Sequence, residues 1–151
     1  MTMTTRPVGT LFLAITTLLM VFALPGCGGP NEAEIDLQTS PEAVGLTELG
    51  ETLRLYQIQF KKPPAKVADL TPLEQMAGMA MDPIRNKTIE VIWGVELPDL
   101  GEQPGLVESQ EILAYEAKTP KEGGYVLFRD RTVKKLTAEE FNAAPKATPG
   151  K

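Results

Sequence analysis

Large apolar side chains recur at intervals of three or four positions between residues 41 and 60 of this 151-residue chain. This spacing places them on one face of a helix, and they are Leu46, Leu49, Leu53, Tyr56 and Phe60. Ser40 is suited to cap the helix, Pro41 to begin it, and the Lys-Lys-Pro-Pro run at 61–64 to end it. We expect a long helix whose apolar stripe is a core face. A partner-binding face is the alternative, although two heptads are short for a coiled coil.

The second half of the chain alternates β-branched and aromatic runs with turn residues, a pattern typical of β-strands. The expected strands are residues 88–93, 112–116, 125–128 and 132–136. An unusually long loop covers 94–110, and a turn covers 119–124. A weaker helical stretch is expected from Asp69 to Met81, where Asp82-Pro83 ends it.

A tight turn is expected at Asp130-Arg131, between the last two strands. A two-residue hairpin loop requires positive φ at both positions. Aspartate tolerates that conformation, whereas arginine resists it. On this interpretation, Arg131→Gly would stabilise the protein by roughly 0.5 to 1 kcal/mol.

These elements predict a single α+β domain over residues 40–143. An N-terminal helix is expected to pack on a small antiparallel β-sheet, arranged as a meander. A short C-terminal helix should begin at 137–140, where Thr-Ala-Glu-Glu has the capping-box pattern, and continue through Phe141. A chain of this length supports one modest core, and we expect residues 144–151 to be a disordered tail.

The N-terminal region combines Arg6 with an apolar run from Val8 to Leu24. At seventeen residues, the run is shorter than the roughly 20 that a membrane-spanning helix needs. A charged start, an apolar centre and small residues before a cleavage point are typical of a secretory signal peptide. We predict a signal peptide over residues 1–26, cleaved between Gly26 and Cys27.

The tetrapeptide Leu24-Pro25-Gly26-Cys27 resembles the lipobox of bacterial lipoproteins. The resemblance implies that Cys27 becomes the mature N-terminus and carries a diacylglyceryl group, usually with a third acyl chain such as palmitate. Two or three acyl chains hold a protein on a membrane essentially permanently. It therefore implies a lipid anchor in the cell membrane or the outer membrane, with the domain outside the cytoplasm. Residues 27–39 are polar and aperiodic, which predicts a lipidated flexible tether.

Charge and composition exclude several classes of function. The chain has fifteen basic and twenty acidic residues, and its net charge is −5. We expect no nucleic-acid partner, because that binding depends on clustered lysine and arginine. The chain has no histidine, and Cys27 is its only cysteine, so imidazole and free thiolate groups are missing from its chemistry. The sequence therefore assigns no catalytic, metal or cofactor-binding residue.

Two charged stretches are candidate binding surfaces. The charged residues of loop 94–110 are all acidic: Glu96, Asp99, Glu102 and Glu108. Their spacing lacks the regular ligand alternation of a calcium loop, and calcium stays open as the less favoured alternative. The last hairpin carries four basic residues: Arg129, Arg131, Lys134 and Lys135. This hairpin could contact anionic lipid or a glycan acid, or simply be solvated.

Residues 42–141 resemble the globular part of bacterial pseudopilin-like domains, and small predicted lipoproteins of unknown function that share the layout. The resemblance is carried by the long helix, the Pro-Pro break, a strand ending in Trp93-Gly94, and the runs Leu-Ala-Tyr-Glu at 113–116 and Gly-Gly-Tyr-Val-Leu-Phe at 123–128. Two departures stand out. A lipobox replaces the pilin leader, and Arg131 stands where a glycine is often found.

These patterns lead us to expect a membrane-anchored envelope lipoprotein that is a non-enzymatic binding or assembly module. Its expected partners are the membrane, through the lipid anchor, and envelope proteins or glycans. The alternative is an accessory subunit of a pilin-like or type II secretion assembly. An enzyme is the third reading, because the usual catalytic groups are missing from the sequence.

Overall fold

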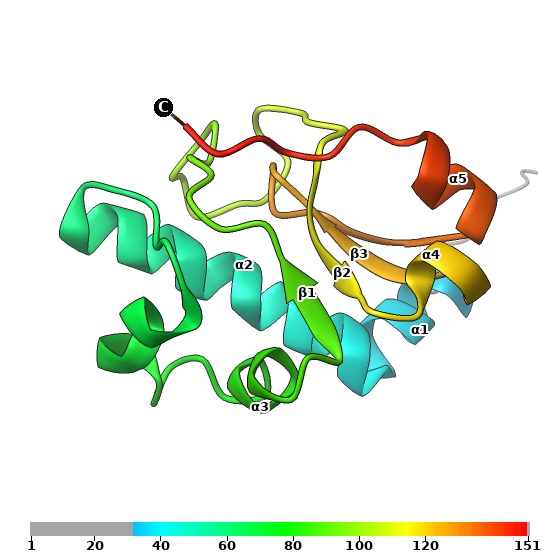
Figure 1. Cartoon of the computed structure of the whole chain (residues 1–151), viewed down its shortest axis with the longest axis horizontal. Helices are drawn as coiled ribbons and strands as arrows, with labels where there is room; N and C mark the ends of the chain where they lie inside the picture. The colour runs from blue at the N-terminus through cyan, green and yellow to red at the C-terminus, as the bar shows by residue number, and fades with distance from the viewer. Residues whose placement is uncertain (1–31, 151) are drawn as a thin grey trace, which may run out of the picture.

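A computed structural model describes residues 32–150 of the chain (Figure 1). Its helices are α1 (Glu32–Thr39), α2 (Pro41–Phe60), the 3₁₀-helix η1 (Val67–Leu73), α3 (Met81–Arg85), α4 (Thr119–Glu122) and α5 (Ala138–Ala143). Its strands are β1 (Ile89–Val91), β2 (Ile112–Glu116), β3 (Gly124–Phe128) and β4 (Val133–Leu136). The predicted α+β class is confirmed. The predicted signal peptide and the predicted lipidation of Cys27 fall outside the described residues.

The four strands form one antiparallel sheet in the order β1-β2-β3-β4, which is the expected meander. The pairing of β2 with β3 is shifted between Ile112 and Ala114, so Leu113 has no direct partner. Such a bulge allows two successive side chains to face the same side. Leu113 and Ala114 accordingly lie in one hydrophobic cluster, while Ile112 lies in a second.

Helix α2 begins at Pro41 and ends at Phe60, as the sequence predicts. Four residues of the stripe are at most 5% exposed: Leu46, Leu49, Leu53 and Tyr56. They share the larger cluster with Leu113, Tyr125 and Leu127 of the sheet. Phe60 is more exposed, and its ring lies 4.5 Å from that of Tyr56. The hydroxyl of Ser40 does not cap α2 but donates to Glu42.

The opposite face of the sheet carries a smaller cluster under α5, formed by Ile112, Val126, Phe128 and Phe141. The predicted capping box is present. The Thr137 hydroxyl accepts from the backbone N–H of Glu140, and the Glu140 carboxylate accepts from the backbone N–H of Thr137. Helices thus lie on both faces of one sheet (Figure 1).

The C-terminal segment is not a disordered tail between residues 144 and 150. The N–H of Ile112 donates to the Pro145 carbonyl, and the N–H of Ala147 donates to the Ile112 carbonyl. The N–H of Gly150 donates to the Gly94 carbonyl, and Ala147 is buried. The prediction was wrong because buried backbone groups of Ile112 need partners, and a polar-looking segment far away in the sequence supplies them.

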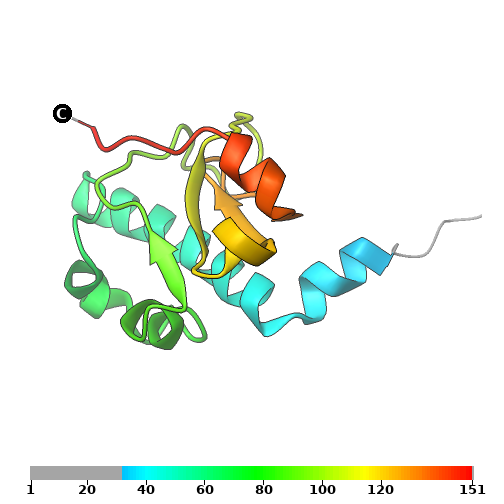
Figure 2. The same cartoon turned by 45° about the vertical axis from the view of Figure 1, so that its right-hand side comes forward.

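Helix α1 occupies residues for which the sequence predicts a flexible tether, so that prediction is wrong for 32–39. An isolated helix of eight residues is marginal in water. Here Leu37 packs against the larger cluster, and Asp36 binds two residues of the sheet. These distant contacts are invisible in the local pattern. Figure 2 shows α1 extending from the start of α2, away from the rest of the fold.

The region between α2 and β1 differs from the single weak helix that was expected. It contains η1 and α3, joined by turns. Asp82-Pro83 does not end a helix but lies in the first turn of α3, where proline is tolerated because its missing N–H would have no partner. Lys61 follows the last residue of α2 as its C-cap and adopts a left-handed conformation with φ of 58°.

The β3–β4 loop has three residues rather than the expected two. The N–H of Phe128 pairs with the Thr132 carbonyl, and the N–H of Arg131 donates to the Phe128 carbonyl. Arg131 has a φ of 68°, while Asp130 does not have positive φ. Three-residue loops commonly end in such a left-handed residue. The preceding turn at 119–124 contains the one-turn helix α4.

Arg131 is 4% exposed despite its charge. Its guanidinium donates to the carbonyls of Gly101 and Gln103 and lies 3.4 Å from a carboxylate oxygen of Glu51. It therefore joins the hairpin to α2 and to loop 94–110.

Arg131→Gly should lower the free energy of unfolding by about 1 to 2 kcal/mol, the opposite of what the two-residue turn implies. Hydrogen bonds from a charged donor contribute roughly 1.5 to 3 kcal/mol, whereas glycine relieves about 1 kcal/mol of left-handed strain. Urea titration of the full chain followed by circular dichroism measures the change.

Lys61→Gly is the matched control, because Lys61 has the same backbone conformation but an exposed side chain. It should stabilise by about 0.5 to 1 kcal/mol. Equal stabilisation by both would contradict the anchoring role of Arg131.

Candidate functional site

The two surfaces predicted from charge are joined to each other. Arg129 donates to the Glu96 carbonyl and forms an ion pair of 2.7 Å with Glu111. Arg131 holds the middle of loop 94–110. The hairpin arginines therefore fasten the acidic loop to the fold, and neither arginine belongs to a free basic ribbon.

The acidic residues of the loop are not gathered into a site. Asp99 accepts from the backbone N–H of Gly101, and Glu96, Glu102 and Glu108 are exposed. Over residues 32–150, no group of three or more histidine, cysteine, aspartate or glutamate side chains is placed to hold a metal ion.

The hairpin lysines also have partners. Lys134 lies over the ring of Phe128, and Lys135 lies over that of Tyr125. Lys135 forms an ion pair of 3.0 Å with Asp36 of α1. The Tyr125 hydroxyl donates to the same carboxylate. This hydrogen bond first, and that from Lys135 second, lower the pKa of Asp36 below its usual value.

Two carboxylates line a hollow of about 480 Å³ between the start of α2, α3 and the sheet. Glu116 is 5% exposed and accepts from the Tyr125 N–H. It also pairs with Lys118, which raises the pKa of that lysine. The second carboxylate, Glu42, has its pKa lowered by its own backbone N–H and by Ser40. A general acid at neutral pH needs a raised pKa, so Glu42 does not fit that role.

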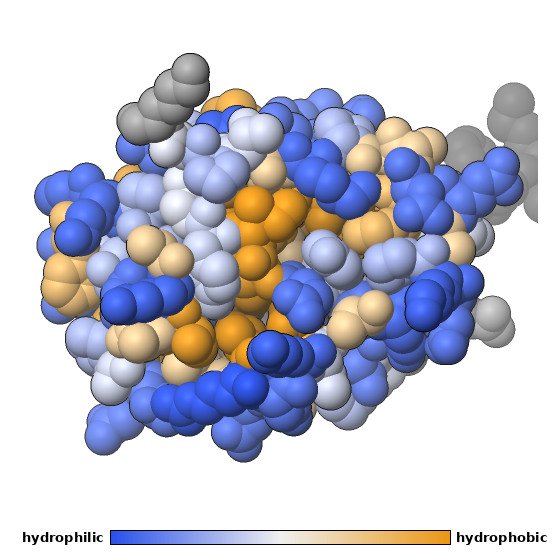
Figure 3. Space-filling view, viewed as in Figure 1, coloured by the Kyte–Doolittle hydropathy of each residue, from blue (hydrophilic) through white to orange (hydrophobic). Residues whose placement is uncertain are grey.

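A second hollow lies along β1 and is called the β1 groove here. It has a volume of about 310 Å³. Its lining combines aliphatic, aromatic and basic side chains with one acidic side chain: Val67, Ile84, Arg85, Lys87, Ile89, Glu90, Val91 and Trp93. Figure 3 shows a strip of hydrophobic surface on this face, bordered by hydrophilic residues. Lys87 and Ile89 also line the Glu116 hollow, so the two hollows are neighbours.

Sequence reasoning missed the β1 groove because its walls come from η1, α3 and β1. The sequence pattern indicates only that Trp93 ends a strand and carries no functional signal for Lys87. Neither position has a signal of its own; only the fold places them beside Val67 and Ile84.

Comparisons of the chain with protein-family models, with curated proteins and with solved structures found no match. Within residues 32–150, no helix combines the length and the apolar character needed to cross a bilayer. A function is therefore inferred from the residues of this chain and their geometry.

The contact of Asp36 with the sheet should weaken in acid. A lowered pKa in the folded state means that this contact stabilises the protein above the unfolded pKa of about 3.9 and is lost as pH falls through the lower folded value. Carbon-13 titration of the Asp36 carboxyl should give a pKa below 3.9, and the protection of α1 amides, relative to their intrinsic exchange rates at each pH, should fall below that pKa.

Tyr125→Phe should raise the pKa of Asp36, because it removes the larger of the two hydrogen-bond effects. Tyr115→Phe is the matched control, since Tyr115 lies in the cluster on the other face of the sheet, and it should leave that pKa unchanged. An Asp36 that titrates at its ordinary value in the wild type would contradict the contact.

Proposed function

We propose that the protein is a bacterial envelope lipoprotein, anchored through lipidated Cys27 in the cell membrane or the outer membrane. The observation that carries this proposal is Leu24-Pro25-Gly26-Cys27 at the end of the apolar run from Val8. Attachment then comes from acyl chains, each buried CH₂ contributing about 0.8 kcal/mol. Helix α1 begins five residues after Cys27, so only a short link separates the anchor from the fold.

The domain that follows the anchor acts as a non-enzymatic binding or assembly module. Support comes from the way its charges are used: Arg129, Arg131 and Lys135 hold segments of the fold together, and Glu42 is held ionised. The β1 groove, in contrast, leaves apolar and basic side chains at the surface. That combination suits recognition of envelope proteins or glycans rather than bond-breaking chemistry.

The alternative role is an accessory subunit of a pilin-like or type II secretion assembly. The order of a long helix, α2, followed by a four-stranded antiparallel meander favours it. That order also agrees with the pseudopilin-like resemblance of residues 42–141. Two features argue against polymerisation through a pilin leader. A lipobox stands in its place, and the position where such a leader needs a glutamate is Ala14. Crosslinking in intact envelopes, followed by identification of the captured proteins, separates the two roles.

The anchor is tested by lipid labelling. Wild-type chain should take up labelled palmitate and partition into detergent. Cys27→Ser should block both lipidation and cleavage, which leaves a precursor held by its leader. The neighbouring change Gly28→Ser keeps the lipobox intact and should be labelled like the wild type.

Replacing residues 1–27 with an ordinary cleavable signal should release a soluble exported domain. The anchor proposal fails if the wild type takes up no lipid label, or if the released domain still sediments with membranes.

A further inference from the structure

Strand β1 lies at one edge of the sheet, and half of its backbone groups face away from β2. The Thr88 carbonyl accepts from the Ala117 N–H, and the Ile92 N–H donates to the Leu113 carbonyl. The N–H and C=O groups of successive residues point to opposite edges of an antiparallel strand. Those of Glu90 therefore also point toward β2, while those of Ile89 and Val91 point away from it. Within residues 32–150, no loop or terminal segment hydrogen-bonds to the backbone of Ile89 or Val91.

The two edges of the sheet are built differently. The β4 edge carries consecutive lysines, Lys134 and Lys135, and edge lysines are a common protection against unwanted strand pairing. The β1 edge has no lysine within the strand. It lies instead against the β1 groove, whose apolar walls include Val67 and the half-buried Trp93.

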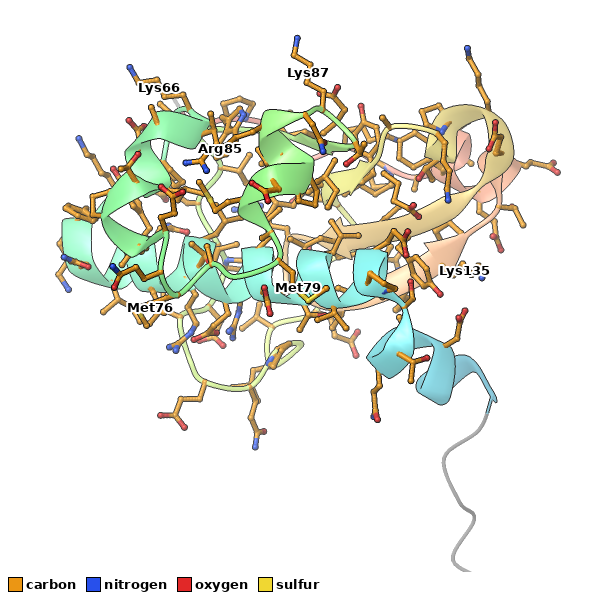
Figure 4. All side chains as sticks on the ribbon, turned by 90° about the horizontal axis from the view of Figure 1, so that it is seen from below. Lys66, Met76, Met79, Arg85, Lys87 and Lys135 are labelled. Atoms are coloured by element: carbon orange, nitrogen blue, oxygen red, sulfur yellow. The ribbon has the colours of Figure 1, made fainter. Side chains whose placement is uncertain are left out.

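Basic side chains lie on the side of the molecule that carries this groove. Figure 4 shows Lys66, Arg85 and Lys87 on the same side of the molecule. Arg85 is paired with Glu74 at 2.6 Å, whereas Lys66 and Lys87 form no ion pair among the described residues. Glu90 is the single acidic residue in the groove lining that the structure describes. Lys87 lines the groove, and Lys66 directly precedes its wall residue Val67. Two lysines without an ion-pair partner in these positions favour an acidic occupant.

We propose that the β1 groove binds an extended, acidic segment of a partner protein, which adds to the sheet as a strand beside β1. Backbone groups of Ile89 and Val91 hydrogen-bond to the added strand, as in other cases of strand addition. Alternate apolar side chains of the segment contact Val67 and Trp93, and its carboxylates pair with Lys66 and Lys87. This site deepens the proposed binding role and rests on it, but it does not depend on the lipid anchor.

A seven-residue peptide that alternates glutamate with valine is the probe, added to the detergent-solubilised full chain. Trp93 is the only tryptophan of the chain, so its fluorescence reports occupancy of the groove directly. Saturable binding with a fluorescence shift is expected. Replacing every glutamate of the peptide with lysine should abolish binding.

Hydrogen exchange gives a readout that a purely electrostatic contact would not move. Amides of Ile89 and Val91 should become protected when the peptide binds, while the amide of Glu90, already directed at β2, should change little. A peptide with N-methyl groups on its alternate pairing amides should neither bind with the same affinity nor protect these positions.

The double variant Lys66→Gln/Lys87→Asn should weaken binding by about tenfold at low salt, with the difference shrinking as salt is added. Asparagine suits position 87 because Lys87 has a φ of 61° and asparagine tolerates that conformation. Lys61→Asn/Lys62→Gln is the matched control. It removes the same two charges and also alters one left-handed lysine, but neither lysine lines the groove or is next in sequence to a residue that does, and it should change binding less than twofold.

Three results would overturn the proposal: no binding of the peptide, binding without protection of Ile89 and Val91, or equal losses in the two double variants. Failure of the anchor is measured separately by palmitate labelling. Peptide binding by a chain that takes up no lipid would reject the anchor and leave the groove intact.

Discussion

The arrangement of this fold depends on the hydrogen bonds that the buried guanidinium of Arg131 donates. Removing a charged group from water costs several kcal/mol unless its hydrogen bonds are replaced. Here burial first, and the nearby Arg54 second, lower the pKa of Arg131. The acceptors come from loop 94–110 and α2. Helix α2 leaves room for it at Gly50, where an added Cβ would lie 3.1 Å from Leu127 and 3.5 Å from Arg131.

The hydrogen bonds of Arg131 explain why the long loop 94–110 keeps a defined path. Long loops without secondary structure are uncommon in compact domains. Arg131 fixes the middle of the loop, and Arg129 fixes its beginning through the Glu96 carbonyl. Ser109, near its end, donates its backbone N–H to Asp130 of the same hairpin. Three consecutive residues of one tight loop thus organise the longest irregular segment that the structure describes.

Elements with strong local signals could be predicted from the sequence. The bounds of α2 follow from Pro41 and the apolar stripe, β2 was expected at its observed residues, and the Thr137 capping box needs only four neighbouring residues. What could not be predicted depends on distant partners. Helix α1 needs Tyr125 and Lys135, and the C-terminal segment needs Ile112. The β1 groove likewise exists only after η1, α3 and β1 have come together.

Helix α1 has a mechanical consequence. A force applied to the chain ahead of Glu32 reaches the core only through this helix. The C-terminal end of α1 continues directly into α2 at Ser40. The force therefore acts first on the few contacts that hold α1 to the fold, which are those of Asp36 with Tyr125 and Lys135 and the packing of Leu37. These few contacts should yield before the fully buried leucines of α2. Unwinding eight residues would then lengthen the link and relieve the tension while the sheet stays folded. Helix α1 would thus extend under force before the rest of the fold opens.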